Sequence, residues 1–312
     1  MGRPALLEHA GPALPRWLDE LLSDAPSSPI AVRSGNLTGS FRRRGGLSST
    51  QVCISGVEEL DILTFQQSVA DAYRAIFDQL QREGIHPIRF WAFIPRLHAD
   101  YGSGLDRYMA FNAGRFAAYS SWLGGSEAFS RSVPTGSAVG SASGAMALCC
   151  LASDSPGMPV ENPRQVPAYR YSRRFGPLPP CFARATRVER GNEPPLLFVG
   201  GTASIRGEES MHAGSVELQT LETFRNLASV ACSGLKRACP SEASTEAEES
   251  AFLQLFRELR IYHPIPEHRQ SIVARVSEHF PGLRRIEAIP AELCRPELLV
   301  EIEGIAESPA GN

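Results

Sequence analysis

The sequence predicts an α/β protein built from two similar units of strands and helices. First, 312 residues are enough for one large domain or for two of about 150 residues each. Second, amphipathic helical segments alternate with short apolar runs that have the length of buried strands. The second half of the chain shows this order as strand, helix, strand, helix, strand, strand, and the first half shows part of it.

The clearest helix of the first half is predicted for residues 64–83, where apolar side chains recur at spacings of three and four. Thr64 is placed to cap its start, and Gly84 follows its end. The apolar run at residues 88–94 (IRFWAFI) then predicts a buried strand. Beyond it we expect a loop and a helix over residues 100–122 that reaches Arg115, a turn over residues 133–143 (VPTGSAVGSAS), and an apolar segment at residues 145–151.

The second half contains the same kinds of element. The expected elements are strands at residues 196–204, 260–263, 283–289 and 298–305, and helices at residues 215–235 and 266–280. Residues 238–250 are acidic and polar, and predict a mobile insertion or the start of another helix. Residues 156–180 hold many prolines and predict a long irregular connection, a kind of segment that is often functional.

The chain divides into three predicted parts. Residues 1–45 are predicted to form an extended or irregular N-terminal segment, residues 46–155 an N-terminal α/β domain, and residues 156–312 a C-terminal domain. Within the first part, residues 34–46 suit a loop or a short edge strand. The run at residues 42–44 (RRR) suits an anion-binding patch, but charge runs more often belong to solvated loops, which we favour.

Charge and hydropathy exclude several kinds of partner. The formal net charge is −3, so the chain lacks the overall basic field that attracts nucleic acids and acidic membranes. No apolar run reaches the length of a membrane span, and the first residues lack the continuous apolar stretch of a signal peptide. We therefore expect no nucleic-acid partner, no membrane insertion and a cytoplasmic location.

The motifs of common metal and cofactor sites are missing from the sequence. The seven cysteines are odd in number, irregularly spaced and without CxxC, so reduced thiols are expected instead of a disulfide framework or a zinc site. The seven histidines form no HxxxH or HExxH, and neither GxGxxG, GKS/GKT nor GxSxG occurs. We expect no metal and no cofactor.

Two segments carry side chains suited to chemistry. Alternation in the closing strand places Leu299, Glu301 and Glu303 on one face, and because surface carboxylates are common on strands, a solvated face is favoured. The loop at residues 169–174 (YRYSRR) suits an anion-binding wall and a solvent-facing basic loop equally well. Cys294, just before the closing strand, is expected to be a small buried apolar residue.

Three segments together resemble the chorismatase family. They are residues 106–119 (DRYMAFNAGRFAAY), 200–207 (GGTASIRG) and 294–303 (CRPELLVEIE), and residues 168–177 (AYRYSRRFGP) and 182–185 (FARA) also fit. Several long segments in the right order are far more specific than one short motif. The C-terminal half also resembles the YjgF/RidA-type (chorismate mutase-like) fold, in which helices back mixed sheets.

The resemblance implies a cofactor-free enzyme that acts on chorismate, a dianion with an enolpyruvyl ether. Glu301 is then the acid that protonates the enol methylene, and burial would raise its pKa enough to keep it protonated. The two substrate carboxylates need cationic partners, since the arginine fork matches a carboxylate. The substrate-binding residues that the resemblance implies are Arg115, Tyr169, Arg170, Tyr171, Arg174, Arg184 and Gly207.

The resemblance also bears on the product. In family members that release 3-hydroxybenzoate with pyruvate, a cysteine lies seven residues before the acid and a glycine lies in the GTAS-containing loop. Cys294 and Gly207 match these positions, where hydrolytic members tend to have alanine. The thiol would relay a proton or help to expel the C4 hydroxyl group. 3-Hydroxybenzoate is therefore the expected product, and 4-hydroxybenzoate is a second product of a few members.

Three alternatives stay open beside this hypothesis. They are a hydrolytic chorismatase that forms a dihydroxycyclohexadiene carboxylate, an imine deaminase suggested only by the shared fold, and a non-catalytic module that binds an aromatic acid. The expected setting is secondary metabolism, for example pigment or quinone biosynthesis. A monomer or a trimer is expected, because proteins of the YjgF/RidA-type fold often use sites at trimer-type interfaces.

Overall fold

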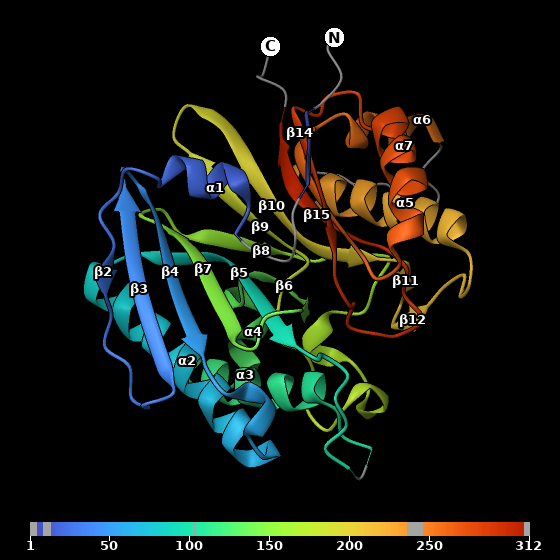
Figure 1. Ribbon diagram of the computed structural model, residues 1–312. Coiled ribbons are helices and arrows are strands. Elements are labelled where there is room, and N and C mark those ends of the chain that lie inside the picture. The colour runs from blue at the N-terminus through green and yellow to red at the C-terminus, as the bar shows by residue number, and fades with distance from the viewer. Residues whose placement is uncertain (1–4, 9–13, 103, 236–245, 309–312) are drawn as a thin grey trace.

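Two β-sheets pack face to face in the middle of the molecule, and helices cover the outer face of each sheet (Figure 1). The computed structural model describes residues 5–8, 14–102, 104–235 and 246–308. The layers are therefore helix, sheet, sheet and helix. This arrangement confirms the predicted class of mixed sheets backed by helices.

The first sheet comes from the N-terminal half of the chain. In spatial order its strands are β2 (Ser28–Pro29), β3 (Leu37–Arg44), β4 (Leu47–Ile54), β7 (Met146–Ser153), β5 (His86–Pro95) and β6 (Thr135–Ser141). Only β5 and β6 are parallel neighbours. The helices of this half are α1 (Arg16–Leu21), α2 (Ile62–Glu83), α3 (Arg107–Leu123) and α4 (Phe129–Ser132), and α2 and α3 pack on the outer face of the sheet.

The second sheet comes mainly from the C-terminal half. In spatial order its strands are β1 (Ala5–Glu8), β14 (Arg285–Pro290), β13 (Phe256–His263), β15 (Glu301–Glu307), β10 (Glu193–Ala203), β9 (Ala185–Arg190) and β8 (Gly157–Val160). A small hairpin of β11 (Ile205–Arg206) and β12 (Glu209–Ser210) follows β10. The helices of this half are α5 (Val216–Leu235), α6 (Glu246–Leu253) and α7 (Arg269–His279). Short 3₁₀ turns are η1 (Val57–Glu59), η2 (Ser126–Ala128), η3 (Ala168–Arg170), η4 (Arg173–Phe175) and η5 (Pro266–His268).

Five strands of each sheet repeat one topology. The order β3-β4-β7-β5-β6 in the first sheet corresponds to β9-β10-β15-β13-β14 in the second. In both units a long helix, α2 or α5, follows the hairpin, and the one parallel pair among these five strands is joined through a helix, α3 or α7. A parallel pair needs such a crossover because a tight turn cannot join it. The prediction of two similar units is confirmed by this topology.

The boundaries of α2 show what sequence periodicity resolves. Its apolar stripe is buried against the first sheet, and Gly84 ends the helix at φ 65°, as predicted. The predicted cap is wrong, because Asp61 and not Thr64 begins the helix. The Asp61 carboxylate accepts hydrogen bonds from the backbone N–H groups of Leu63 (2.9 Å) and Thr64 (3.0 Å). Aspartate is among the strongest N-cap residues, so the helix starts two residues earlier than expected.

The predicted turn at residues 133–143 is wrong in most of its length, because residues 135–141 form β6. Six of its seven residues are buried, and all seven are small. The second sheet approaches closely at this point, and a Cβ added to Gly200 of β10 would lie 3.2 Å from the Gly136 carbonyl oxygen. Small residues are needed here because the two sheets pack closely. In the sequence, such a run of small residues has the composition of a turn.

The closing strand is central and not solvated, so the favoured interpretation of its carboxylates is wrong. β15 lies between β13 and β10, and the side chains of Glu301 and Glu303 face the first sheet. Glu301 is 4% exposed and Glu303 is 2% exposed. Alternation had placed both on one face correctly, but only the packing of the sheets decides that this face is buried.

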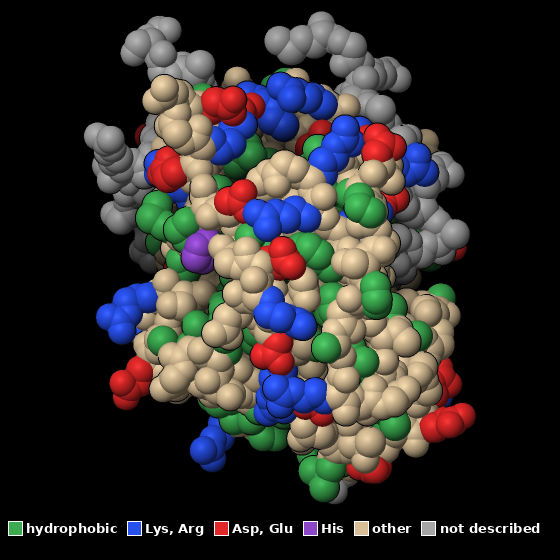
Figure 2. Space-filling view, turned by 90° about the vertical axis from the view of Figure 1, so that its left-hand side faces the viewer, with side chains coloured by type: hydrophobic (Ala, Val, Ile, Leu, Met, Phe, Trp, Pro, Cys, Tyr) green, Lys and Arg blue, Asp and Glu red, His purple; other side chains and the backbone are tan. Residues whose placement is uncertain are grey.

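The N-terminal part of the chain contributes to both sheets. β1 pairs with β14 in the second sheet, and β3 is a full strand of the first sheet, although irregular structure was expected here. Its three arginines form exposed or half-buried ion pairs and no anion patch: Arg42 with Asp19 (3.0 Å), Arg43 with Asp154 (2.6 Å) and Arg44 with Asp24 (3.4 Å). Basic and acidic side chains are interspersed over this side of the molecule (Figure 2).

Five of the described cysteines carry free thiols, namely Cys53, Cys149, Cys150, Cys181 and Cys294. Cys232 is disulfide-bonded, so the expectation of reduced thiols is wrong for this residue. In the described part of the chain, no helix combines the length and the apolar character needed to cross a membrane.

Candidate active site

A cavity of about 250 Å³ lies between the two units. Its walls come from the start of α3, from β6, from the segment at residues 171–184, from the end of β10, and from residues 294–297 with the first residue of β15. Most of the surface that these residues present to the cavity is apolar. The charged groups inside it therefore act in a medium of low dielectric constant, where electrostatic interactions are strong.

Glu301 lies at the start of β15 and reaches into this cavity. Its carboxyl group packs directly against Gly201 of β10, which has no room for a Cβ atom. No described residue donates a hydrogen bond to it. Burial, followed by the nearby charge of Glu303, raises the pKa of Glu301 to about 8, although Arg89 and Arg184 act in the opposite direction. Glu301 therefore carries a transferable proton near neutral pH.

Cys294 and Tyr108 line the cavity beside Glu301. Burial, with a further contribution from Glu301, raises the pKa of the Cys294 thiol to about 12. Burial likewise raises the pKa of the Tyr108 phenol. Both groups are therefore neutral proton donors at physiological pH. Cys294 is only partly buried and lines the cavity, so the expectation of a small buried apolar residue is wrong.

Two buried arginines give the cavity positive charge. Arg115 of α3 donates a hydrogen bond to the Asn112 side chain (2.7 Å), and Arg184 donates to the Val166 carbonyl oxygen (2.9 Å) and the Tyr171 hydroxyl group (2.7 Å). Both guanidinium groups lie over the ring of Phe182. Among the described residues neither has a carboxylate within ion-pair distance, and the Nε atom of each lacks a hydrogen-bond partner.

An unneutralised guanidinium in a low-dielectric cavity favours binding of an anion, because a buried charge is costly unless it is paired. One carboxyl group that acts on Arg184 is Glu161, whose own pKa is raised to about 7 by burial. It therefore neutralises Arg184 only in part. Two such arginines suit a ligand that carries two negative charges.

Arg295 is a third cation of the cavity wall, and the sequence analysis missed it as a site residue. Its guanidinium lies 3.9 Å from the centre of the Phe175 ring and donates hydrogen bonds to the Glu208 carbonyl oxygen and the Ser210 hydroxyl group (both 2.9 Å). Ser137 and Tyr108 of the wall were missed too. Arg295 and Tyr108 both lie inside the segments that carry the family resemblance, so that signal was available. Ser137 lies in the segment mistaken for a turn.

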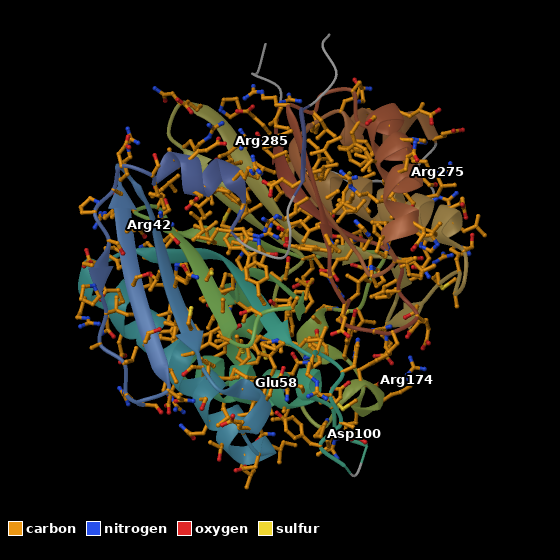
Figure 3. The ribbon with its side chains drawn as sticks, in the orientation of Figure 1. Arg42, Glu58, Asp100, Arg174, Arg275 and Arg285 are labelled. Atoms are coloured by element: carbon orange, nitrogen blue, oxygen red, sulfur yellow. The ribbon has the colours of Figure 1, made fainter. Side chains whose placement is uncertain are left out.

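Four of the seven expected substrate-binding residues line the cavity. Arg115, Tyr171 and Arg184 line the cavity with buried or half-buried side chains. Arg174 lines its rim, but its side chain is 52% exposed and is ion-paired with Glu208 (3.8 Å) and Glu209; Figure 3 shows it at the outer edge of the molecule.

Tyr169, Arg170 and Gly207 lie outside the cavity wall. The Tyr169 ring packs near that of Phe129, and Arg170 is exposed. Gly207 occupies the turn between β11 and β12 at φ 60°, where glycine avoids the strain of a side chain. A Cβ there would meet nothing within 4 Å, so space for a substrate ring does not explain this glycine.

The described residues contain no group of three or more His, Cys, Asp or Glu side chains placed to hold a metal ion. The chemistry that the cavity offers from its own residues is proton transfer to a bound anion. Glu301 can supply the proton, Cys294 and Tyr108 lie in the same wall, and the arginines can hold negative charge.

Comparisons with known proteins fit this geometry. A family model described as "Chorismatase FkbO/Hyg5-like, N-terminal" matches residues 33–152. A 3-hydroxybenzoate synthase of Streptomyces hygroscopicus is 31% identical over 246 residues, which cover 77% of this chain and 69% of that protein. A chorismatase of Streptomyces rapamycinicus is 28% identical over 253 residues, 77% of this chain and 70% of that protein.

Among solved structures, a crystal structure of chorismatase matches with a TM-score of 0.71 at 23% identity, over 89% of this chain and 80% of that one. A member of the YjgF/YER057c/UK114 family from Mycobacterium tuberculosis matches 41% of this chain and 86% of that one, with a TM-score of 0.27 and 23% identity. The coverage of the chorismatase match means that it includes residues of both halves of this chain.

Proposed function

The chain belongs to the chorismatase family, and we propose that it converts chorismate to 3-hydroxybenzoate and pyruvate. The observation that carries the proposal is a buried Glu301, its pKa raised to about 8, in the same cavity as two arginines that have no carboxylate partner among the described residues. Chorismate offers two carboxylates to such cations and an enol ether to such an acid. The similarity to a protein named 3-hydroxybenzoate synthase supports this product.

The reaction begins with proton transfer. Glu301 donates its proton to the methylene carbon of the enolpyruvyl group, and the neighbouring carbon becomes an oxocarbenium ion. Water adds to this carbon and returns a proton to Glu301. The bond from this carbon to the ether oxygen then breaks, and pyruvate leaves while the oxygen stays on the ring as a hydroxyl group. A positioned general acid supplies a factor of about 10²–10⁴ in rate.

The ring must also lose its C4 hydroxyl group to become aromatic. The water lost from the ring balances the water taken up by the pyruvyl carbon, so 3-hydroxybenzoate and pyruvate together contain the atoms of chorismate. Cys294 lies in the wall beside Glu301 with its thiol protonated, and it supplies a proton to the departing hydroxyl group. The ring becomes aromatic by losing the hydrogen of C3 as a proton, which restores the thiol. A hydrolytic outcome would instead leave both ring oxygens in place.

Arg115, Arg184 and Arg295 hold the substrate by its carboxylates. The planar guanidinium group donates two parallel hydrogen bonds to a carboxylate, which fixes orientation as well as charge. The aromatic rings of Tyr171, Phe175 and Phe182 pack against these cations and exclude water. Cytoplasmic location, the monomeric or trimeric state, and a role in pigment or quinone biosynthesis stay predictions from the sequence.

The test is product analysis. Purified protein is incubated with chorismate and no added cofactor, and the products are separated and identified by mass. Equal amounts of pyruvate and 3-hydroxybenzoate are expected. Pyruvate with a dihydroxycyclohexadiene carboxylate would keep the family and the acid but overturn the product. Binding of chorismate without release of pyruvate would favour a non-catalytic binding protein.

A further inference from the structure

A second carboxylate, Glu303, is fixed in the layer between the sheets behind the cavity. One of its oxygens accepts hydrogen bonds from Arg89 (2.6 Å) and Ser137 (2.5 Å), and the other accepts one from the indole N–H of Trp91 (2.9 Å). All three donors belong to the first sheet, whereas Glu303 belongs to the second. With this set of donors, Glu303 is held as a negative charge in one orientation.

This network reaches the acid through the cavity wall. The Ser137 hydroxyl group donates to Glu303 and accepts hydrogen bonds from Arg89 (2.9 Å) and from the backbone N–H of Gly201 (2.9 Å). Gly201 is the residue against which the Glu301 carboxyl group packs. The Ser137 hydroxyl group therefore links Glu303 to the backbone of Gly201, against which Glu301 packs.

We propose that Glu303 is a positioning residue for Glu301, acting through its negative charge and through the Ser137–Gly201 wall. The inference rests on the proposed function, because it takes Glu301 as the acid of the reaction. Glu303 does not line the cavity, so it does not touch the substrate itself.

The charge effect has a clear sign. The groups that act on Glu301 are Glu303 on its own strand, Arg89 from β5, Arg184 from the segment before β9, Cys294 from the turn before β15, and Tyr108 from α3. Glu303 opposes a second negative charge at Glu301, and it neutralises Arg89, which would otherwise favour that charge. Loss of the Glu303 charge should therefore make Glu301 more acidic for both reasons.

The test compares pH profiles of kcat for the wild type, Glu303→Gln and Glu287→Gln. Glu287 is the matched control, because it is equally buried and accepts a hydrogen bond from buried Arg260 (3.0 Å), yet it does not contribute to the shift of Glu301. We expect Glu303→Gln to shift the alkaline limb of the kcat profile to lower pH by about one pH unit. The ratio of kcat at pH 8.5 to kcat at pH 6 then falls roughly tenfold, whereas Glu287→Gln keeps the wild-type limb.

The outcomes separate the two proposals. An alkaline limb at the wild-type pH in Glu303→Gln, or an equal shift in Glu287→Gln, overturns the positioning role. No chorismate turnover by the wild type overturns the proposed function instead. If circular dichroism shows that Glu303→Gln does not fold, Ser137→Ala decides, since it removes the hydroxyl group that links Glu303 and Arg89 to Gly201 and leaves the Glu303 carboxylate in place. A fall in kcat of about tenfold with KM nearly unchanged supports the positioning role, and an unchanged kcat contradicts it.

Discussion

The proposed acid of the cavity, Glu301, is a carboxyl group whose surroundings decide its protonation. Glu301 shares its strand face with Glu303, but the two have different neighbours: Glu303 has three hydrogen-bond donors, whereas Glu301 has none among the described residues. Two carboxyl groups in different environments take different roles, one charged and one proton-bearing. This difference is invisible in the sequence, where both are glutamates on one strand.

Removal of the proton donor should abolish catalysis and leave the fold intact. We expect Glu301→Gln to lower kcat by about 10²–10⁴, because the amide fills the same space but cannot donate a proton to carbon. Its far-ultraviolet circular dichroism should match that of the wild type. Turnover at the wild-type rate would show that another group is the acid.

The Glu301 carboxyl group should make the free energy of unfolding depend on pH. The pKa of Glu301 is about 8 in the folded protein and near 4.5 in the absence of its surroundings, so its contribution to stability is fully present below 4.5 and is lost as the pH rises through 8. We expect the free energy of unfolding of the wild type, relative to Glu301→Gln, to fall between pH 5 and pH 8.5. Urea denaturation of both proteins at the two pH values measures it. A constant difference would contradict the raised pKa.

Arg115 should act on substrate affinity. Loss of a charged hydrogen bond to a bound carboxylate costs about 1.5–3 kcal/mol, so Arg115→Met should raise KM for chorismate by roughly 10–100-fold. Arg170→Met is the matched control, because Arg170 is exposed and lies outside the cavity wall. Equal effects of the two variants would mean that the binding site extends beyond the cavity.

Strand β10 contributes backbone to the site. Its pairing with β15 is interrupted between Val199 and Thr202, and Gly200 and Gly201 occupy this irregularity. Here Gly200 lies against the first sheet and Gly201 against Glu301, so each lacks the space for a Cβ atom. The pair of glycines therefore lets β10 approach both the neighbouring sheet and the acid.

A methyl group at Gly201 should displace the acid. We expect Gly201→Ala to lower kcat by about 10²-fold, since a shift of about 1 Å in a reacting group has this order of effect. Gly191→Ala is the control: Gly191 lies in a turn at φ 63° with open space around it, so it should lose about 1–2 kcal/mol of stability and keep its activity. Full activity of Gly201→Ala would contradict the contact with Glu301.

The two units are joined through buried polar groups as well as apolar packing. Arg89 of the first sheet donates hydrogen bonds to Glu303 and to the Val199 carbonyl oxygen of the second. The cavity depends on this union, since Arg115 and Glu301 come from different units. Any change that separates the sheets therefore removes the site.

Removal of only one partner of the Arg89–Glu303 pair should destabilise the folded protein strongly. We expect Arg89→Met to destabilise the protein by about 3–5 kcal/mol, and Arg89→Met with Glu303→Leu to recover part of that loss, because an apolar pair no longer leaves a buried charge. Arg33→Met, which breaks an exposed pair with Asp78, should change stability by less than about 1 kcal/mol. Denaturant unfolding measures all three, and equal effects would contradict a buried pair.

Local patterns in the sequence located the long elements and indicated the family, and the resemblance to that family proposed Glu301 as the acid. Regular apolar periodicity located α2 and α5, short apolar runs located β5 and β10, and three ordered segments indicated the chorismatase family. These signals are local or are carried by residue types that the family shares. The predicted boundary of α2 was wrong because the Asp61 side chain, and not Thr64, caps the start of this helix.

Only the tertiary structure decided which charged residues form the site. Arg115 and Arg295 line the cavity while Arg170 does not, because the packing of the two sheets buries some arginines and leaves others in solvent. The same packing buries Glu301 and Glu303 and turns the small residues of β6 into a strand. Burial and charge pairing depend on residues far apart in the chain, so no local pattern reports them.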